Sequence, residues 1–194
     1  YKRQGLYAAD EWTVGGLVFA FGRPDYQSGS YGTRIIGSNE FANVADMRVA
    51  VSWFIDGYSN RREQWERVGL FPFPNDYLTI VIGTSNDGPT VSYAHGQAWA
   101  QSAQALQSYV NAYYPNAKIR VSGGVDLEPG FGTYSDAYNW VLGYNSVPNR
   151  PLYNFGSADG CWPSQFDYAN VPVEAQPPPL GIGWVCDNGW THDN

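Results

Sequence analysis

Three strand-length segments in which bulky and small residues alternate constrain the fold of this chain more than any other feature. Residues 16–22, 78–84 and 120–128 place mainly large apolar side chains at every second position, with smaller residues between them. Because side chains alternate between the two faces of a strand, each segment has one bulky face and one face of smaller side chains. The bulky faces are suited to packing against a layer of helices.

Segments with helical periodicity separate these strands. Apolar residues recur at helical spacing in residues 44–57, 93–113 and 134–144, and residues 152–155 form a fourth strand-like segment. Strands that alternate with helices in this way predict a parallel sheet with right-handed crossover connections. The stretch rich in glycine, serine and tyrosine after residue 22 is interpreted as a loop.

The contrast between bulky and small strand faces favours a barrel wall over a flat doubly wound sheet, in which helices must cover both faces. The predicted fold class is therefore α/β, a parallel (β/α) barrel-type fold. Four to five β/α units fit in the chain, whereas a full eight-unit barrel usually takes about 250 residues. Residues 1–194 are predicted to form one domain, or the N-terminal part of one, with a loop region at 156–194.

Composition excludes several classes of partner. The formal charge is -7 with only 11 Lys and Arg residues, so the basic surface that nucleic acids and anionic membranes require is missing. No apolar run approaches the roughly 20 residues of a membrane span. Neither a nucleotide-binding fingerprint nor a set of metal ligands is present, so we expect no cofactor and no metal. Aromatic residues reach 16%, which suits contacts with sugar rings or with a protein surface.

Two cysteines, Cys161 and Cys186, lie in the loop-rich C-terminal stretch. Zinc and cytosolic redox motifs need closer pairs or more ligands, so a disulfide is the better interpretation. Closing a loop of about 25 residues would contribute roughly 3 kcal/mol in an oxidising compartment. The pair therefore predicts a secreted or cell-surface protein.

The clearest chemical signal is Asp126 and Glu128 at the end of the third strand. Both acids share the face of smaller residues, and active sites of α/β enzymes lie at the C-terminal ends of strands. Residues two apart are about 6.6 Å apart along the backbone, so the carboxyl groups repel and one pKa should rise. We expect Glu128 to be that general acid. Alternatively, Asp126 caps the following turn and Glu128 is a solvated strand end.

Other side chains are weaker candidates for ligand binding. Asn86 follows the second strand and either lines the same cleft or forms an Asn-Asp-Gly turn. Asn154, on the fourth strand, is predicted to hydrogen-bond a ligand. Trp162 and Trp190 form either a stacking platform or a hydrophobic cluster anchored by the disulfide. We expect His95 to cap or pack near the start of the long helix rather than act as a base.

Five segments together resemble a group of secreted actinobacterial-type proteins that are regarded as glycoside-hydrolase-like TIM barrels. The resemblance covers most of the chain from residue 16 onward and rests on residues 82–87, 94–100, 123–129, 153–161 and 186–190. It implies a barrel fold and a role in glycan hydrolysis. Members of the group continue well beyond the equivalent of Trp190, so the resemblance also implies a further segment that completes the barrel.

The Asp-x-Glu spacing is similar, more distantly, to that of family 25 lysozymes and family 18 chitinases. This similarity implies that Glu128 protonates the glycosidic oxygen and that Asp126 orients it or stabilises positive charge. The chain departs from the family 18 signature, because Ser122 and Gly124 stand where that family has further acids. Family 25 enzymes also carry an Asp at the end of the first strand, and the nearest acid here is Asp25.

The sequence therefore predicts a secreted glycoside-hydrolase-like protein that acts on an extracellular or cell-wall polysaccharide. The alternative is a non-catalytic extracellular protein that binds glycan or assembles with itself through its aromatic surface. An incomplete barrel would favour this alternative, because open sheet edges must be paired or covered.

Overall fold

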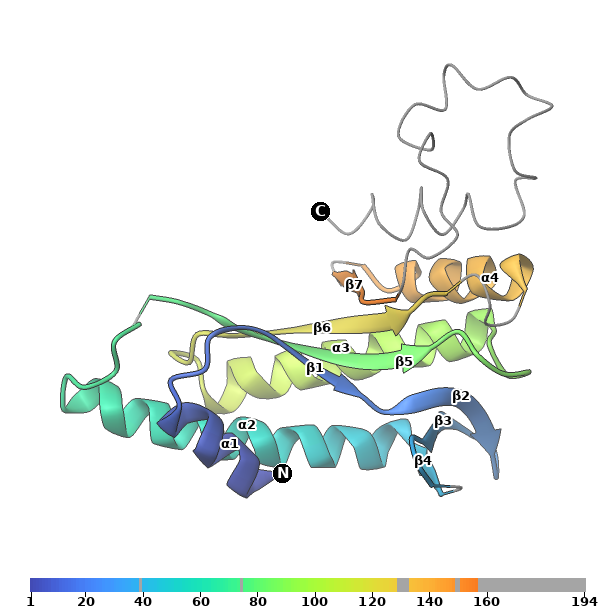
Figure 1. Ribbon diagram of the computed structural model, residues 1–194. Coiled ribbons are helices and arrows are strands. Elements are labelled where there is room, and N and C mark those ends of the chain that lie inside the picture. The colour runs from blue at the N-terminus through green and yellow to red at the C-terminus, as the bar shows by residue number, and fades with distance from the viewer. Residues whose placement is uncertain (39, 74, 129–132, 149–150, 157–194) are drawn as a thin grey trace, which may run out of the picture.

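The computed structural model shows a mixed α/β fold (Figure 1). It describes residues 1–38, 40–73, 75–128, 133–148 and 151–156. Within these residues the strands form a four-stranded parallel sheet and a three-stranded antiparallel sheet. No helix of this part is long and apolar enough to cross a membrane.

The parallel sheet follows the order of the chain, β1-β5-β6-β7, and every neighbouring pair is parallel. The predicted parallel sheet is confirmed, and closure into a barrel stays a prediction. The strands are β1 (Gly15–Ala20), β5 (Leu78–Ser85), β6 (Ile119–Asp126) and β7 (Leu152–Asn154), and the helices that connect them are α2 (Val44–Arg67), α3 (Tyr93–Tyr113) and α4 (Tyr134–Asn145).

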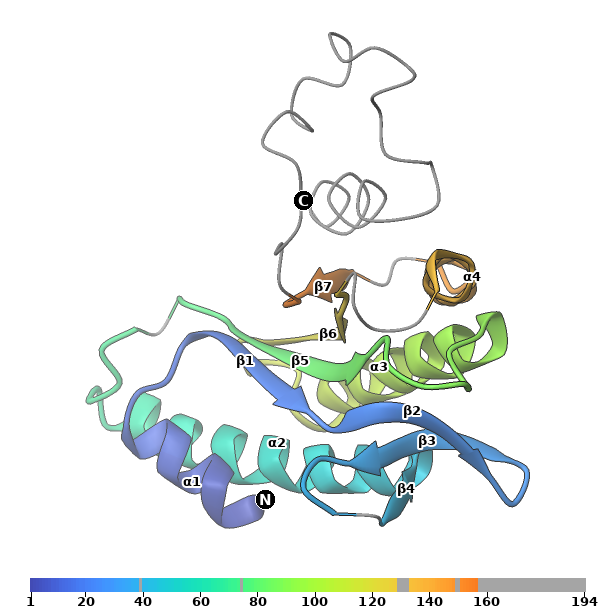
Figure 2. The same ribbon diagram turned by 45° about the vertical axis from the view of Figure 1, so that its right-hand side comes forward.

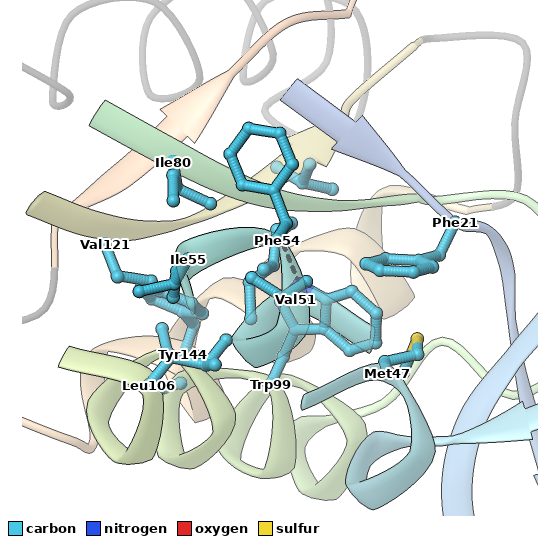
Figure 3. Close-up of a cluster of buried hydrophobic side chains, with 14 of the residues drawn as sticks. Phe21, Met47, Val51, Phe54, Ile55, Ile80, Trp99, Leu106, Val121 and Tyr144 are labelled. Carbon is cyan, nitrogen blue, oxygen red and sulfur yellow. Dashed lines mark hydrogen bonds between the residues drawn. The ribbon is translucent and has the colours of Figure 1, made fainter. Parts of the chain in front are cut away.

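One face of the sheet carries the hydrophobic core. Helices α2 and α3 lie along this face in both views (Figures 1 and 2). The bulky residues of the strands point toward the helices, as the alternation predicted, and meet Trp99 of α3 and Tyr144 of α4. Figure 3 shows the central members of this cluster, which include Phe21, Met47, Val51, Phe54, Ile55, Ile80, Leu106 and Val121.

Helix α3 is fixed by two buried polar side chains. Trp99 is 1% exposed and donates from Nε1 to the carbonyl oxygen of Ile82 on β5, at 2.8 Å. His95 is fully buried, and its Nδ1 accepts from Nε1 of Trp140 at 2.8 Å. Since an indole nitrogen only donates, the imidazole proton lies on Nε2, which donates to the carbonyl oxygen of Gly32 at 2.8 Å. His95 therefore packs as expected and joins three elements.

The antiparallel sheet was not predicted. Residues 22–43 form β2 (Gly22–Gln27), β3 (Ser30–Ile35) and β4 (Phe41–Asn43) where the sequence suggested a loop. These strands are short, polar and partly exposed, so they lack the apolar alternation that marks the parallel strands. Their local signal is the Ser28-Gly29 pair, whose φ angles of 51° and 82° suit a two-residue hairpin turn.

Two helical segments also differ from the prediction. A first helix, α1 (Lys2–Asp10), packs against α2 and was not expected. Helix α2 runs to Arg67 rather than ending at residue 57. Its second half is rich in charged residues, and the i,i+4 ion pairs Arg62–Glu66 at 2.6 Å and Arg67–Glu63 at 3.0 Å support it in place of an apolar stripe.

Acid should weaken this fold through His95. Burial lowers the pKa of His95 from 6.5 to about 4. Between these pH values the unfolded chain binds a proton that the folded chain does not, so stability falls as the pH falls. This lowering of the His95 pKa corresponds to roughly 3 kcal/mol of folding stability. We expect the free energy of unfolding, measured by urea denaturation, to drop by about this amount between pH 7 and pH 4 through this residue.

The variant His95→Gln isolates this contribution, because glutamine does not titrate. The variant should be less stable at pH 7, and its deficit against the parent protein should shrink steadily toward pH 4. A deficit that stays constant over this range would show that His95 is not buried in its neutral form.

Candidate functional site

The predicted acid pair lies at the edge of the parallel sheet where β5 and β6 end, on the right in Figure 1. Asp126 is the last residue of β6, and Glu128 follows two residues later. Leu127 between them is 1% exposed and belongs to the core, whereas both acids are partly exposed. The strand alternation thus continues past the end of β6 and turns both carboxyl groups away from the helix layer.

Small residues on this face allow an aromatic ring to lie across the sheet beside the acids. A Cβ atom on Gly83 would lie 2.6 Å from Cζ of Phe155, and one on Gly124 would lie 3.1 Å from Cε1 of the same ring. Glycine is therefore needed at position 83 for the Phe155 ring to approach β5, and at position 124 mainly because a Cβ atom there would lie 2.4 Å from Cγ1 of Val81. The ring adds an apolar wall on the face that carries the acids.

Asp126 has a raised pKa. Burial at the strand end is the largest cause, and the charge of Glu128 and a hydrogen bond with it raise the pKa further. The sequence argument expected one raised pKa in the pair but assigned it to Glu128. In the structure, burial at the end of β6 raises the pKa of Asp126.

Asn86 supports Glu128 from the neighbouring strand. Its Oδ1 accepts from the backbone nitrogen of Glu128 at 3.0 Å, and its Nδ2 donates to the Glu128 carbonyl oxygen at 3.0 Å. The backbone nitrogen of Asn86 donates to the carbonyl oxygen of Asp126 at 3.2 Å. Asn86 is only 5% exposed, so it positions the acid-bearing backbone. Sequence reasoning missed this role, which depends on a residue 42 positions away.

Asn154 supports the same segment from β7. Its Oδ1 accepts from the backbone nitrogen atoms of Leu127 at 3.3 Å and Gly156 at 3.0 Å. These nitrogen atoms follow the ends of their strands, where the sheet no longer offers an acceptor for them. The structure therefore brings Asn86, Asn154 and the acid pair together, with both amide oxygens bound to backbone.

Asp25 lies in the β2–β3 hairpin. Its carboxylate accepts from Nη2 of Arg34 at 2.8 Å, from Nε2 of Gln27 at 2.9 Å and from the backbone nitrogen of Tyr26 at 2.9 Å. Burial by itself would raise the pKa of Asp25, but the hydrogen bonds and the Arg34 charge together lower it. These partners belong to the hairpin, so the contacts of Asp25 give it a structural role there.

Four predicted residues lie outside the described residues. Trp162 and Trp190, the proposed stacking residues, and Cys161 and Cys186, the proposed disulfide, all fall in 157–194. Their roles stay predictions. Among the residues that the structure does describe, no three His, Cys, Asp or Glu side chains cluster closely enough to hold a metal ion. The two adjacent carboxyl groups at the strand edge can transfer protons.

The raised pKa of Asp126 predicts a pH-dependent effect of Asp126→Asn. Above its ordinary pKa of 3.8 the folded chain holds a proton that the unfolded chain has lost, so stability falls as the pH rises. The variant should be more stable than the parent protein at pH 7, and the gain should vanish by pH 3. Urea denaturation across this range measures the difference.

A 13C NMR titration of the Asp126 carboxyl group measures its pKa directly. In Glu128→Gln the pKa of Asp126 should fall only in part, since burial outweighs the neighbouring charge. If Asp126 titrated at its ordinary pKa in the parent protein, its partial burial beside Glu128 would be contradicted.

Asn86→Ala should destabilise the protein by about 1–3 kcal/mol, because the change leaves the Glu128 backbone without its partners. Hydrogen exchange at the Glu128 amide should also become faster. Asn139→Ala is the matched control, since Asn139 is exposed on α4 and its loss should stay within about 0.5 kcal/mol. Equal stability of the two variants would argue against the positioning role.

No protein-family model matches this chain, and neither does any curated protein or solved structure. The acid pair, together with the two asparagines that support it at the sheet edge, is therefore the feature of the chain that suggests a function.

Proposed function

We propose that this chain is a secreted glycoside-hydrolase-like protein that hydrolyses an extracellular or cell-wall polysaccharide by acid and base catalysis. The observation that carries the proposal is the contact between Asp126 and Glu128 at the carboxyl ends of parallel strands. Burial and the neighbouring acid raise the pKa of Asp126, so the pair retains a proton to higher pH than an isolated carboxyl group would.

The sheet topology supports the proposal. The parallel strands lie in chain order, and the core-forming helices pack on one face. A doubly wound sheet would instead carry helices on both faces and reverse its strand order at a switch point. The sheet of this protein, with helices on one face, has the arrangement that the wall of a (β/α) barrel requires. Its face of small residues would then be turned to the inside of the barrel. The acid pair would then lie at the mouth of the barrel.

In the proposed reaction the acid pair delivers one proton to the glycosidic oxygen. Glu128, which lies beyond the end of β6, receives the proton held by Asp126 through their hydrogen bond and transfers it to the glycosidic oxygen as the bond to the sugar carbon breaks. Asp126 becomes the partner that holds negative charge and stabilises the positive charge on the sugar ring. Water then adds to the sugar carbon, and its proton returns to the carboxylates. Asn86 keeps Glu128 in place throughout.

A second candidate is a non-catalytic protein that binds glycan or assembles with itself. The open edge of β1 favours it, because β1 pairs with β5 on one side and with no described strand on the other. A groove of about 490 Å3 follows this strand and is lined by apolar and aromatic residues that include Tyr7, Leu17, Val18 and Phe54. A sheet edge that no described strand covers favours pairing with another chain.

The test is release of reducing ends from a panel of soluble and cell-wall glycans. The parent protein should release them, and Glu128→Gln and Asp126→Asn should each lower the rate by about 100-fold or more. Asp46→Asn is the control, because Asp46 is an exposed acid in the first turn of α2. Its rate should equal that of the parent protein.

The other outcomes separate the candidates. Equal release by the parent protein and Glu128→Gln would show that Glu128 is not the acid. Absence of release from every glycan, together with a concentration-dependent increase in mass in sedimentation, would favour the assembling protein.

A further inference from the structure

Phe155, the residue after β7, lies level with Asp126 on the neighbouring strand. Its backbone nitrogen donates to the carbonyl oxygen of Val125 at 3.0 Å, which continues the pairing of β6 with β7 by one step beyond Asn154. Side chains that are level in a parallel ladder leave the sheet on the same face. The Phe155 ring and the Asp126 carboxyl group therefore lie on the same face of the sheet, side by side.

The residues on both sides of Phe155 contact the backbone that joins the two acids. Oδ1 of Asn154 accepts from the backbone nitrogen of Leu127 at 3.3 Å and from that of Gly156 at 3.0 Å. A Cβ atom on Gly156 would lie 2.4 Å from the nitrogen of Leu127, so the two backbones touch. Phe155 is thus held in place from both of its neighbours, next to the acid pair.

The Phe155 ring extends over the strand step that precedes Asp126. Gly124 and Gly83 are paired in register on the face of the acid, and the ring approaches the Cβ positions of both. Val81 reaches the same place, because its Cγ1 lies 2.4 Å from the Cβ position of Gly124. The ring and Val81 therefore meet and form one apolar wall, which keeps water from this side of the acid.

The polar neighbours of Asp126 leave burial as the main influence on its protonation. Ser85 is its partner on β5, and the Ser85 Oγ accepts from the backbone nitrogen of Asp87 at 3.3 Å. Tyr153 of β7 is 51% exposed. The charge and hydrogen bond of Glu128 raise the pKa of Asp126, but burial is the larger cause. An apolar wall beside the carboxyl group accounts for this loss of solvent.

We propose that Phe155 is a positioning residue of the acid pair, whose ring excludes water from one side of Asp126 so that the pair keeps a proton for transfer. Without the ring, water would solvate the Asp126 carboxylate, and the pair would lose its proton at a lower pH. The catalytic consequence rests on the proposed hydrolysis of glycans. The effect on protonation does not, because it requires only the folded protein.

The first test uses the full chain without any substitution. In a 13C NMR titration, the ring carbon signals of Phe155 should shift with the same midpoint as the carboxyl carbon of Asp126, because the ring lies beside the charge that appears. Ring signals that stay constant while Asp126 titrates would overturn the proposal.

Substitutions then test the cause. Phe155→Ala should lower the pKa of Asp126 toward its ordinary value of 3.8 without reaching it, because Glu128 remains. Phe155→Leu keeps an apolar side chain at this position, so it should fold like the parent protein and lower the pKa less. Tyr153→Ala is the matched control, since it removes a half-exposed ring from the same strand and should leave the pKa unchanged.

An unchanged pKa of Asp126 in both Phe155 variants, or an equal decrease in Tyr153→Ala, would overturn the proposal. Hydrolysis adds a second measurement. A general acid must be protonated, so kcat/KM falls as the pH rises through its pKa. In Phe155→Ala this fall should move to lower pH by the same amount as the carboxyl titration. If the pKa of Asp126 decreases but the parent protein releases no reducing ends, the proposed hydrolysis fails and the effect of Phe155 on protonation is supported.

Discussion

The buried hydrogen bonds of Trp99 and His95 are the contacts on which the rest of the structure depends. Trp99 ties α3 to the Ile82 carbonyl group on β5, and His95 ties the same helix to Gly32 of the hairpin and Trp140 of α4. Both side chains are enclosed, so sliding α3 along the sheet would leave several polar groups buried without partners. The helix layer therefore has one register against the strands.

That register sets the geometry of the acid pair. Because Leu127 is held in the core, Asp126 and Glu128 must turn to the other face of the sheet. The backbone beyond the end of β6 would lack acceptors, and Asn86 and Asn154 supply them. Two amide side chains from neighbouring strands thus hold two carboxyl groups side by side. Catalysis by the pair would depend on this support as much as on the acids themselves.

Local periodicity predicted the parallel strands and the helices between them, and the bounds of α3 agree with the prediction at both ends. It missed the hairpin, whose polar strands carry no apolar alternation. It also ended α2 too early, because Arg62 is a charged residue that becomes buried only through Glu66 and the carbonyl groups of Phe73 and Asp76. Such compensation involves residues that a periodic pattern does not connect.

The amino-acid sequence alone determined which residues share a strand face and that two acids follow the end of a strand, because side-chain direction is a local property of the backbone. Only the tertiary structure decided that Asp126 is partly buried with a raised pKa, what Asn86 binds, and that Arg62 is buried against the carbonyl groups of Phe73 and Asp76. Burial and hydrogen bonding depend on segments far apart in the chain, and these meet only when the helices pack against the sheet.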